Sequence, residues 1–179
     1  MKRIMYYLTV AVLSLFFRVN ACDTAHAMSV VLVPDNSQEM AENDGMVGRL
    51  YIPDLGIDVA AYDVTKDGAA IRQKVTDDED SAAYFRAGTE TIIADHTDQG
   101  FSVIENAVPG ETVAYMLKGK TCEKYICVEA DQGQNTTRDL YDKNGVSFTK
   151  RNDEGGFVTY TCYIGWEIIR YAVWMPVEQ

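Results

Sequence analysis

Short apolar segments alternate with polar turns along most of this chain, and their lengths predict β-strands rather than long helices. Two segments with helical spacing of apolar residues, 69–75 and 101–107, predict short helices, and one helical turn is predicted near 140–141. The predicted strands are 49–53, 57–62, 90–94, 112–117, 121–129, 157–162 and 168–175. Seven or so short strands with minor helices predict a small, mostly β barrel or sandwich.

The N-terminus has a different pattern. Basic residues at positions 2 and 3 precede an apolar run over 4–17, which is shorter than the roughly 20 residues of a membrane-spanning helix. The sequence Ala25-His26-Ala27 is typical of a signal peptidase site and predicts cleavage before Met28. A retained N-terminal anchor and lipidation at a box over 19–22 remain alternatives. All three hypotheses place the domain outside the cytoplasm.

The predicted organisation has three parts: a signal peptide or membrane anchor over 1–27, a polar tether over 28–47, and one domain over 48–179. A chain of 179 residues suits one domain with a real core. The net charge of −11 argues against nucleic acid and against a basic membrane-binding surface. The acidic run over 77–80 lacks the spacing of a calcium loop, so we expect a solvated loop and no metal or other cofactor.

Three cysteines remain if Cys22 leaves with the leader. Cys122 and Cys127 fall in one predicted strand, where five residues span roughly 16 Å. A disulfide needs Cα atoms within about 7 Å, so the two are expected to be core or half-buried strand residues rather than a pair. Cys162, at the end of a predicted strand, is the cysteine that needs a function.

Candidate chemistry gathers at strand ends. His96 is the only histidine after leader removal and follows one predicted strand, whereas Cys162 ends another and Arg170 lies on the next. A thiol, a general base and a cation suit nucleophilic catalysis. The alternative is structural: a packed cysteine, a surface histidine, and an arginine paired with an acid such as Glu167.

The register of the final hairpin bears on this choice. With a five-residue loop over 163–167, Cys162 lies opposite Ile168 and Tyr160 lies opposite Arg170. Cys162 and Arg170 then share a face as diagonal neighbours, about 7–8 Å apart. A cation at that place lowers the pKa of a thiol and stabilises a developing oxyanion.

These features resemble the sortases, the cysteine transpeptidases of Gram-positive cell surfaces. The similarity runs in order from Gly48 to Trp174. The segments that carry it are Gly48-Arg49-Leu50-Tyr51-Ile52-Pro53 with Gly56-Ile57, Thr91-Ile92-Ile93-Ala94-Asp95-His96, Phe101 to Glu111 with its Pro109-Gly110-Glu111 turn, Thr161-Cys162, and Arg170-Tyr171-Ala172-Val173-Trp174.

The resemblance implies a closed β-barrel of seven to eight strands with one or two short helices, monomeric and without a cofactor. It implies that Cys162 attacks a backbone carbonyl of a sorting-signal peptide and forms a thioester. His96 then acts as general acid and base, and Arg170 holds the carbonyl. An amine of a cell-wall peptide or a pilin lysine would resolve the acyl-enzyme. Retained signal anchors are common among sortases, which favours attachment to the membrane at the cell surface.

The sequence also departs from the sortase pattern. Only Thr161-Cys162 remains of the usual Thr-Leu-x-Thr-Cys, and Asp95 stands where glycine is frequent before the histidine. The short loop between Cys162 and Arg170 leaves little room for an added helix that reads the substrate. Two alternatives therefore stay open: a catalytically silent barrel that binds peptide or wall components, and a thiol peptidase of the same fold that uses water as acceptor.

Overall fold

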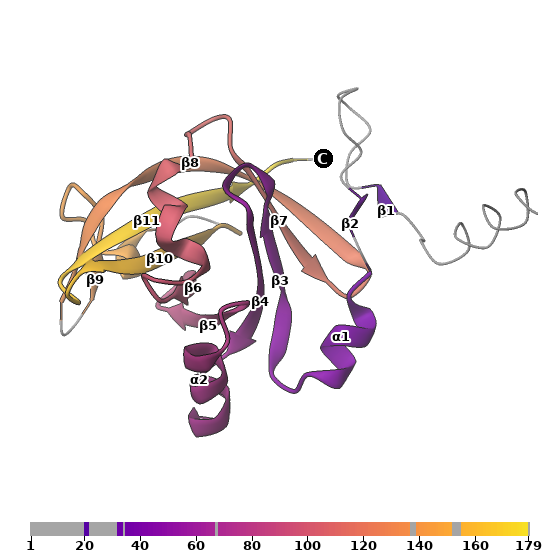
Figure 1. Cartoon of the computed structure of the whole chain (residues 1–179). Coiled ribbons are helices and arrows are strands. Elements are labelled where there is room, and N and C mark those ends of the chain that lie inside the picture. The colour runs from indigo at the N-terminus through magenta and orange to yellow at the C-terminus, as the bar shows by residue number, and fades with distance from the viewer. Residues whose placement is uncertain are drawn as a thin grey trace, which may run out of the picture.

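The computed structural model describes residues 20–21, 32–33, 35–66, 68–136, 139–151 and 155–178. Its main feature is a sheet with the strand order β11-β10-β6-β5-β4-β3-β7-β8-β9 (Figure 1). Strand β11 also pairs with β8, so eight strands close into a barrel and β9 lies outside it. The strands are β3 (Met46–Ile52), β4 (Ile57–Asp63), β5 (Ser81–Ala87), β6 (Glu90–Asp95), β7 (Val113–Lys118), β8 (Thr121–Asn135), β9 (Leu140–Tyr141), β10 (Phe157–Ile164) and β11 (Ile168–Pro176).

This architecture confirms the predicted closed barrel. One barrel strand was missed: β5 directly follows the acidic run, and only its first residues are fully buried, so it lacks a clean alternation. The helical turn predicted near 140–141 is wrong. Strand β8 continues to Asn135, and its last two residues pair with Leu140 and Tyr141 as a short hairpin.

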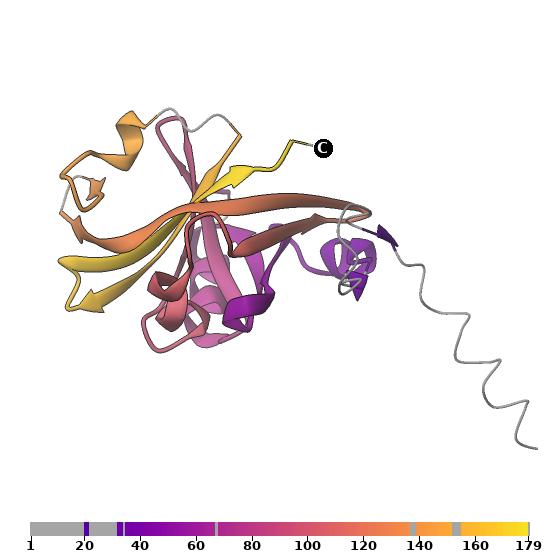
Figure 2. The ribbon, with the colours of Figure 1, turned by 90° about the horizontal axis from the view of Figure 1, so that it is seen from above.

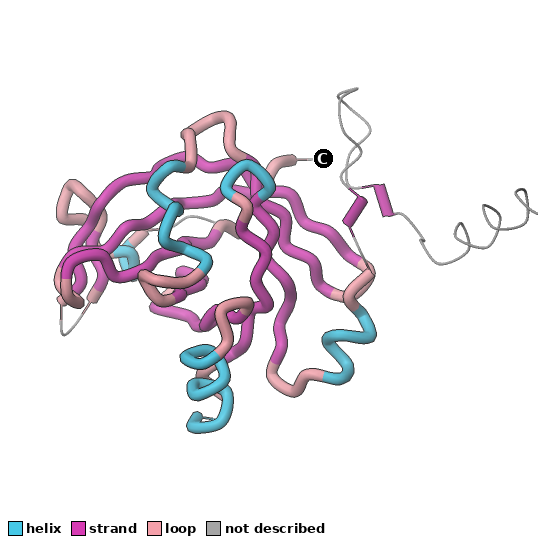
Figure 3. The backbone as a smooth tube through the Cα atoms, in the orientation of Figure 1, coloured by secondary structure: helices cyan, strands magenta, loops and turns pink. Residues whose placement is uncertain are grey.

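Short helices lie outside the barrel wall (Figure 3). They are α1 (Ser37–Glu42), η2 (Pro53–Leu55), α2 (Gly68–Asp77), η3 (Gly100–Asn106) and η4 (Phe148–Lys150), where η marks a 3-10 helix. The predicted helices over 69–75 and 101–107 thus correspond to α2 and η3.

The segment ahead of the barrel is more ordered than the predicted tether. Helix α1 lies beside the turn between β7 and β8 (Figures 1 and 2), where the Asn36 side-chain amide donates to the Leu117 carbonyl at 3.4 Å. Met40 packs against a cluster that includes Met46 and Tyr62. Burial of these side chains explains why the first barrel strand begins at Met46, two residues before the predicted domain start.

Little of the N-terminal region is described. Strand β1 (Asn20–Ala21) pairs with β2 (Leu32–Val33) in antiparallel fashion. The predicted cleavage site, the apolar run over 4–17 and Cys22 lie outside the described residues. Among the helices that are described, none combines the length and apolar character needed to cross a membrane.

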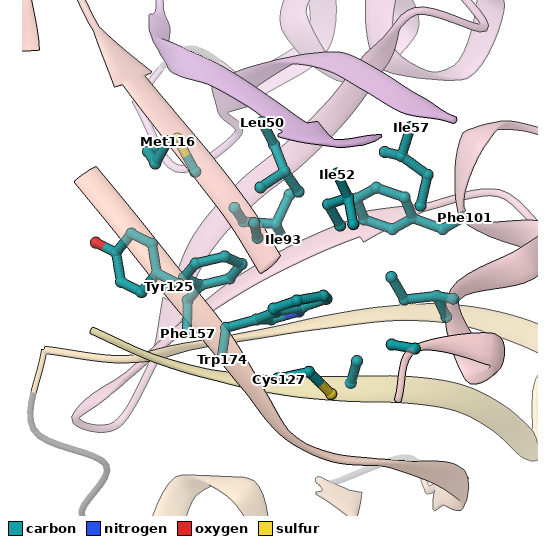
Figure 4. Close-up of a cluster of buried hydrophobic side chains, with 14 of the residues drawn as sticks. Leu50, Ile52, Ile57, Ile93, Phe101, Met116, Tyr125, Cys127, Phe157 and Trp174 are labelled. Carbon is teal, nitrogen blue, oxygen red and sulfur yellow. The ribbon is translucent and has the colours of Figure 1, made fainter. Parts of the chain in front are cut away.

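The main core fills the barrel interior. Figure 4 shows Phe101 of η3 beside Ile52 and Ile57, so η3 contributes to the core as well as covering it. Trp174 is fully buried there, and its indole N–H donates to the Thr159 hydroxyl at 2.8 Å. This bond satisfies both polar groups, whose burial would otherwise cost free energy.

A second buried cluster lies on the other side of strands β10 and β11. It contains Val158, Ile169 and Tyr171, and the segment 139–151 contributes Leu140 and Phe148 to it. Because side chains alternate along a strand, odd-numbered residues of β10 face the barrel interior, as Phe157 does, and even-numbered residues face this outer cluster.

The described cysteines differ in state. Cys127 is a buried free thiol and Cys162 is a free thiol of intermediate exposure. The two cysteines of β8 therefore do not pair with each other, as predicted. Cys122 is half-buried but disulfide-bonded, which was not predicted from the sequence.

Candidate active site

Parallel pairing of β6 with β10 brings the predicted histidine and cysteine to the same end of the sheet. The register runs from Val158 opposite Ile92 to Thr161 opposite Asp95. His96 is the first residue after β6, and Cys162 is the next residue of β10. Strand alternation puts Cys162 on the outer face, and a continued alternation would put His96 there too. The register therefore carries both residues to the same end of two adjacent strands.

The Cys162 thiol is protonated in the resting protein at neutral pH. Its pKa is raised above the ordinary value, and burial is the cause. The neighbouring Tyr160 is also affected: burial, followed by the charge of Cys162, raises the pKa of its phenol to about 12. His96 is exposed, so the imidazole is open to solvent and to a bound peptide.

The predicted register of the final hairpin is wrong by one residue. Strand β10 extends to Ile164, which pairs with Ile168, and an irregularity at residue 163 lets Cys162 pair with Ile169. Arg170 is consequently opposite Thr161 rather than Tyr160. Residues paired across antiparallel strands share a face, so strand alternation puts Arg170 on the inner face and Cys162 on the outer one.

Arg170 is held by groups on two neighbouring elements. Its guanidinium donates to the Ser102 carbonyl at 2.8 Å and forms a salt bridge with Glu105 at 3.0 Å, both on η3. It also lies over the ring of Tyr163, 3.6 Å from the centroid, which is a cation–π contact. Its acidic partner is thus Glu105, not the Glu167 considered from sequence. These contacts tie β11 to η3 and to the residue after Cys162.

Asp95 is a buried carboxyl directly before His96. Its Oδ1 accepts the His96 backbone N–H at 2.7 Å, and the residue is only 8% exposed. Burial raises its pKa from 3.8 to about 6, and the hydrogen bond and charge of His96 offset part of that effect. From the sequence, Asp95 was considered only as a departure from the glycine that is frequent before the histidine. Its position between an apolar strand and the only histidine of the predicted domain was a signal that could have indicated a functional role.

The rest of the site carries no metal signature. In the described ranges, no group of three or more histidine, cysteine, aspartate or glutamate side chains is arranged to hold a metal ion.

Comparison with known proteins identifies the fold. No protein-family model matches the chain, and no curated protein does. Solved structures do match: sortase C of Clostridium perfringens SM101 is 15% identical with a TM-score of 0.50, over 76% of this chain and 72% of that one. Sortase C of Streptococcus pneumoniae is 12% identical with a TM-score of 0.54, over 79% and 73%. The Group B Streptococcus Pilus Island 1 sortase C2 is 17% identical with a TM-score of 0.54, over 78% of each chain. The chain therefore has a sortase-like fold.

Proposed function

We propose that this protein is an extracytoplasmic cysteine transpeptidase of the sortase type. The observation that supports the proposal is the parallel register of β6 and β10, in which Asp95 pairs with Thr161, the residues directly before His96 and Cys162. A thiol and an imidazole on one exposed edge are the minimum for acyl transfer through a covalent intermediate.

The proposed reaction has two stages. The Cys162 sulfur attacks a backbone carbonyl of a sorting-signal peptide, and its proton passes to His96. The imidazolium then protonates the leaving amine as the C–N bond breaks, which gives a thioester on Cys162. In the second stage an acceptor amine attacks the thioester and loses a proton to His96, and the C–S bond breaks to release the thiolate. The imidazolium then returns this proton to the sulfur, so that the enzyme regains its starting state.

The environment of the thiol makes proton removal the demanding step. Because burial raises the pKa of Cys162, few molecules hold a thiolate at neutral pH, and His96 must accept the proton during the attack. We therefore expect acylation to become faster as the pH rises from 6 toward the pKa of the thiol.

The third proposed group is Arg170, which would stabilise the oxyanion of the tetrahedral intermediate. Its contact with Tyr163 keeps the cation next to the residue that follows Cys162. Because Glu105 holds the guanidinium on the inner face, this role requires the side chain to reach around the end of β10 when a peptide binds.

Substrate and location follow the same proposal. One structural neighbour, sortase C of Clostridium perfringens with its C-terminal cell wall sorting motif, has a TM-score of 0.52 at 14% identity, over 76% of this chain and 74% of that one. We propose a sorting-signal peptide as acyl donor and a cell-wall peptide or pilin lysine as acceptor, with a monomeric enzyme at the outer face of the membrane or secreted.

The test is the mass of the intact full-length chain after mixing with a pool of sorting-signal peptides and no acceptor amine. We expect an adduct on Cys162 that hydroxylamine releases. It should be absent in Cys162→Ala and strongly reduced in His96→Ala. A folded protein that forms no adduct, although Cys162 reacts with iodoacetamide, would contradict the proposal for those peptides.

The second candidate is a silent barrel that binds peptide or wall components without turnover. The observation that favours it is the raised pKa of the thiol: burial is its cause, and among the described residues no cation lowers this pKa. Saturable peptide binding without any Cys162 adduct would support this candidate. An adduct that decays at the same rate with and without amines would instead indicate a peptidase that uses water.

A further inference from the structure

A row of polar side chains crosses the inner face directly beneath the proposed site. Asp95 on β6 pairs with Thr161 on β10, and Thr161 pairs with Arg170 on β11. The three residues therefore lie side by side on consecutive strands, on the face opposite to His96 and Cys162. Asp95 and Thr161 each stand directly before one of those two residues in the chain.

Three buried atoms of this row lack hydrogen-bond partners among the described residues: Asp95 Oδ2, the Thr161 hydroxyl and Arg170 Nε. Arg170 Nε still has an ionic partner in Glu105, 3.0 Å away, whereas the other two atoms have none. Unpaired polar atoms in a protein interior cost free energy and are rare. The backbone N–H groups of Gly100 and Phe101 approach the Asp95 carboxyl and lower its pKa as weak hydrogen-bond donors, but neither meets the geometry of a full hydrogen bond to Oδ2.

Gly100, at the start of η3, allows the backbone to pack closely against the Asp95 carboxyl. A Cβ at Gly100 would lie 3.3 Å from Asp95 Oδ2 and 3.1 Å from Val59. Glycine therefore lets the start of η3 approach the carboxyl and seal it from solvent. His96 lies in the short loop between Asp95 and Gly100, so the buried Asp95 carboxyl fixes the first end of that loop.

We propose that Asp95 is a positioning residue for His96, acting through a hydrogen bond that it shares with the Thr161 hydroxyl. This inference rests on the proposed function. The two side chains stand on paired residues of adjacent strands, and a side-chain rotation is needed to join their two unpaired atoms. The bond can form in either protonation state. The hydroxyl donates to the carboxylate, or the protonated carboxyl donates to the hydroxyl. In the charged state Oδ1 also holds the His96 N–H by a charge-assisted bond, which is the stronger kind.

Protonation of Asp95 would therefore loosen the histidine loop at mildly acidic pH. The charged groups that approach Asp95 are His96 on the same loop and, beyond Thr161, Arg170 with its partner Glu105 on η3. The neighbour of Gly100 on β4 is the apolar Val59. The carboxylate form, present above pH 6, is the form expected to hold His96 in place.

The first test measures this titration without requiring turnover. In full-length protein carrying His96→Gln, which removes the imidazole, the backbone amide of residue 96 reports on Asp95 alone. We expect its proton chemical shift and the Asp95 carboxyl ¹³C shift to change together with a midpoint at or above pH 6, because the charge of His96 lowers the pKa of Asp95 in the parent protein. Adding Asp95→Asn should abolish the amide transition, and Asp98→Asn, an exposed aspartate in the same loop, should leave it unchanged.

A second pair of variants tests the shared hydrogen bond. Thr161→Val removes the donor to the carboxylate and should move the Asp95 midpoint upward, whereas Thr161→Ser should restore it. An Asp95 carboxyl that titrates near 4, or an amide transition that survives Asp95→Asn, would overturn the proposal. So would a midpoint that is the same in Thr161→Val as in the parent protein.

The kinetic test uses the enzyme with its histidine in place. Asp95→Asn should lower kcat for peptide acylation about tenfold at pH 7.5, with KM within about twofold, because a misplaced base affects the chemical step rather than binding. Unchanged kcat would contradict the positioning role. If no variant forms an adduct, the proposed function fails, while the nuclear magnetic resonance result still decides whether Asp95 controls the loop.

Discussion

Arg151 is the residue whose removal we expect to weaken the outer cluster most. It forms salt bridges with Glu129 at 3.0 Å and Asp142 at 3.4 Å. Glu129 also accepts the Tyr171 hydroxyl, at 2.5 Å. These contacts fix the segment 139–151 to strands β8 and β11, and that segment covers the cluster on the same face as Cys162.

The expected magnitude follows from burial. The side chains of Arg151, Glu129 and Asp142 are 17%, 19% and 5% exposed. Breaking a fully buried pair by removing one partner costs about 3–5 kcal/mol. Partial exposure at Arg151 and Glu129 lets water screen the remaining charges, so Arg151→Met should cost about 2–3 kcal/mol. Methionine keeps the apolar stem, so most of this loss is electrostatic.

Urea unfolding of the full-length chain measures the free energy, and a double-mutant cycle with Glu129→Gln isolates the pair. In Glu129→Gln the side chain can still accept the Tyr171 hydroxyl. The substitution removes the negative charge of Glu129, which Arg151→Met alone leaves without its ion-pair partner. The double variant should therefore be at least about 1 kcal/mol more stable than the sum of the single effects. Amide exchange over 139–151 should accelerate in Arg151→Met. A loss below about 0.5 kcal/mol, or strictly additive effects, would refute the reasoning.

Three further predictions concern the site. Cys162→Ala should abolish thioester formation and change the free energy of unfolding by less than about 1–2 kcal/mol, since the side chain is small and partly exposed; wild-type acylation by this variant would remove Cys162 from the mechanism. Arg170→Lys should reduce acylation nearly as much as Arg170→Ala, because lysine lacks the planar fork; full activity in Arg170→Lys would reduce the role to charge. The raised pKa of Asp95, about 6 against 3.8, means that the folded state holds this proton more tightly than the unfolded state. Stability should thus be lost as the pH rises from 4 to 6, by about 1–2 kcal/mol after allowance for screening, and urea unfolding of Asp95→Asn should show no such fall.

The barrel could be predicted from the sequence because most strands carry their own signal. Alternation and β-branched residues locate strands such as β3 and β11, whereas β5 shows no clean alternation of buried and exposed residues. The register of the final hairpin depends on one irregular residue at position 163. Such irregularities depend on packing around the turn rather than on a local pattern, so the sequence could not place Arg170 on the correct face.

The parallel pairing of the strands that lead to His96 and Cys162 could not be predicted from spacing either. Their strands are far apart in the chain, and nothing local reveals that β6 and β10 are parallel neighbours. The expectation that His96 and Cys162 act together came from the order of the segments and their resemblance to sortases. A role for Asp95 could not be predicted because its burial is visible only in the structure. A single acid at a strand end does not by itself indicate a function.

The residues of the proposed site lie on two faces of the barrel wall, and the two faces should respond differently to mutation. His96 and Cys162 are on the outer face and are at least partly exposed, so their removal should cost acylation and little stability. Thr161 and Arg170 are on the inner face, where Thr161 is fully buried and Arg170 ties β11 to η3. Changes there should reduce stability and acylation together. Arg170→Ala distinguishes the two possible roles of this cation: lost acylation with intact stability means that Arg170 reaches the substrate, whereas parallel losses mean that it supports the site from beneath.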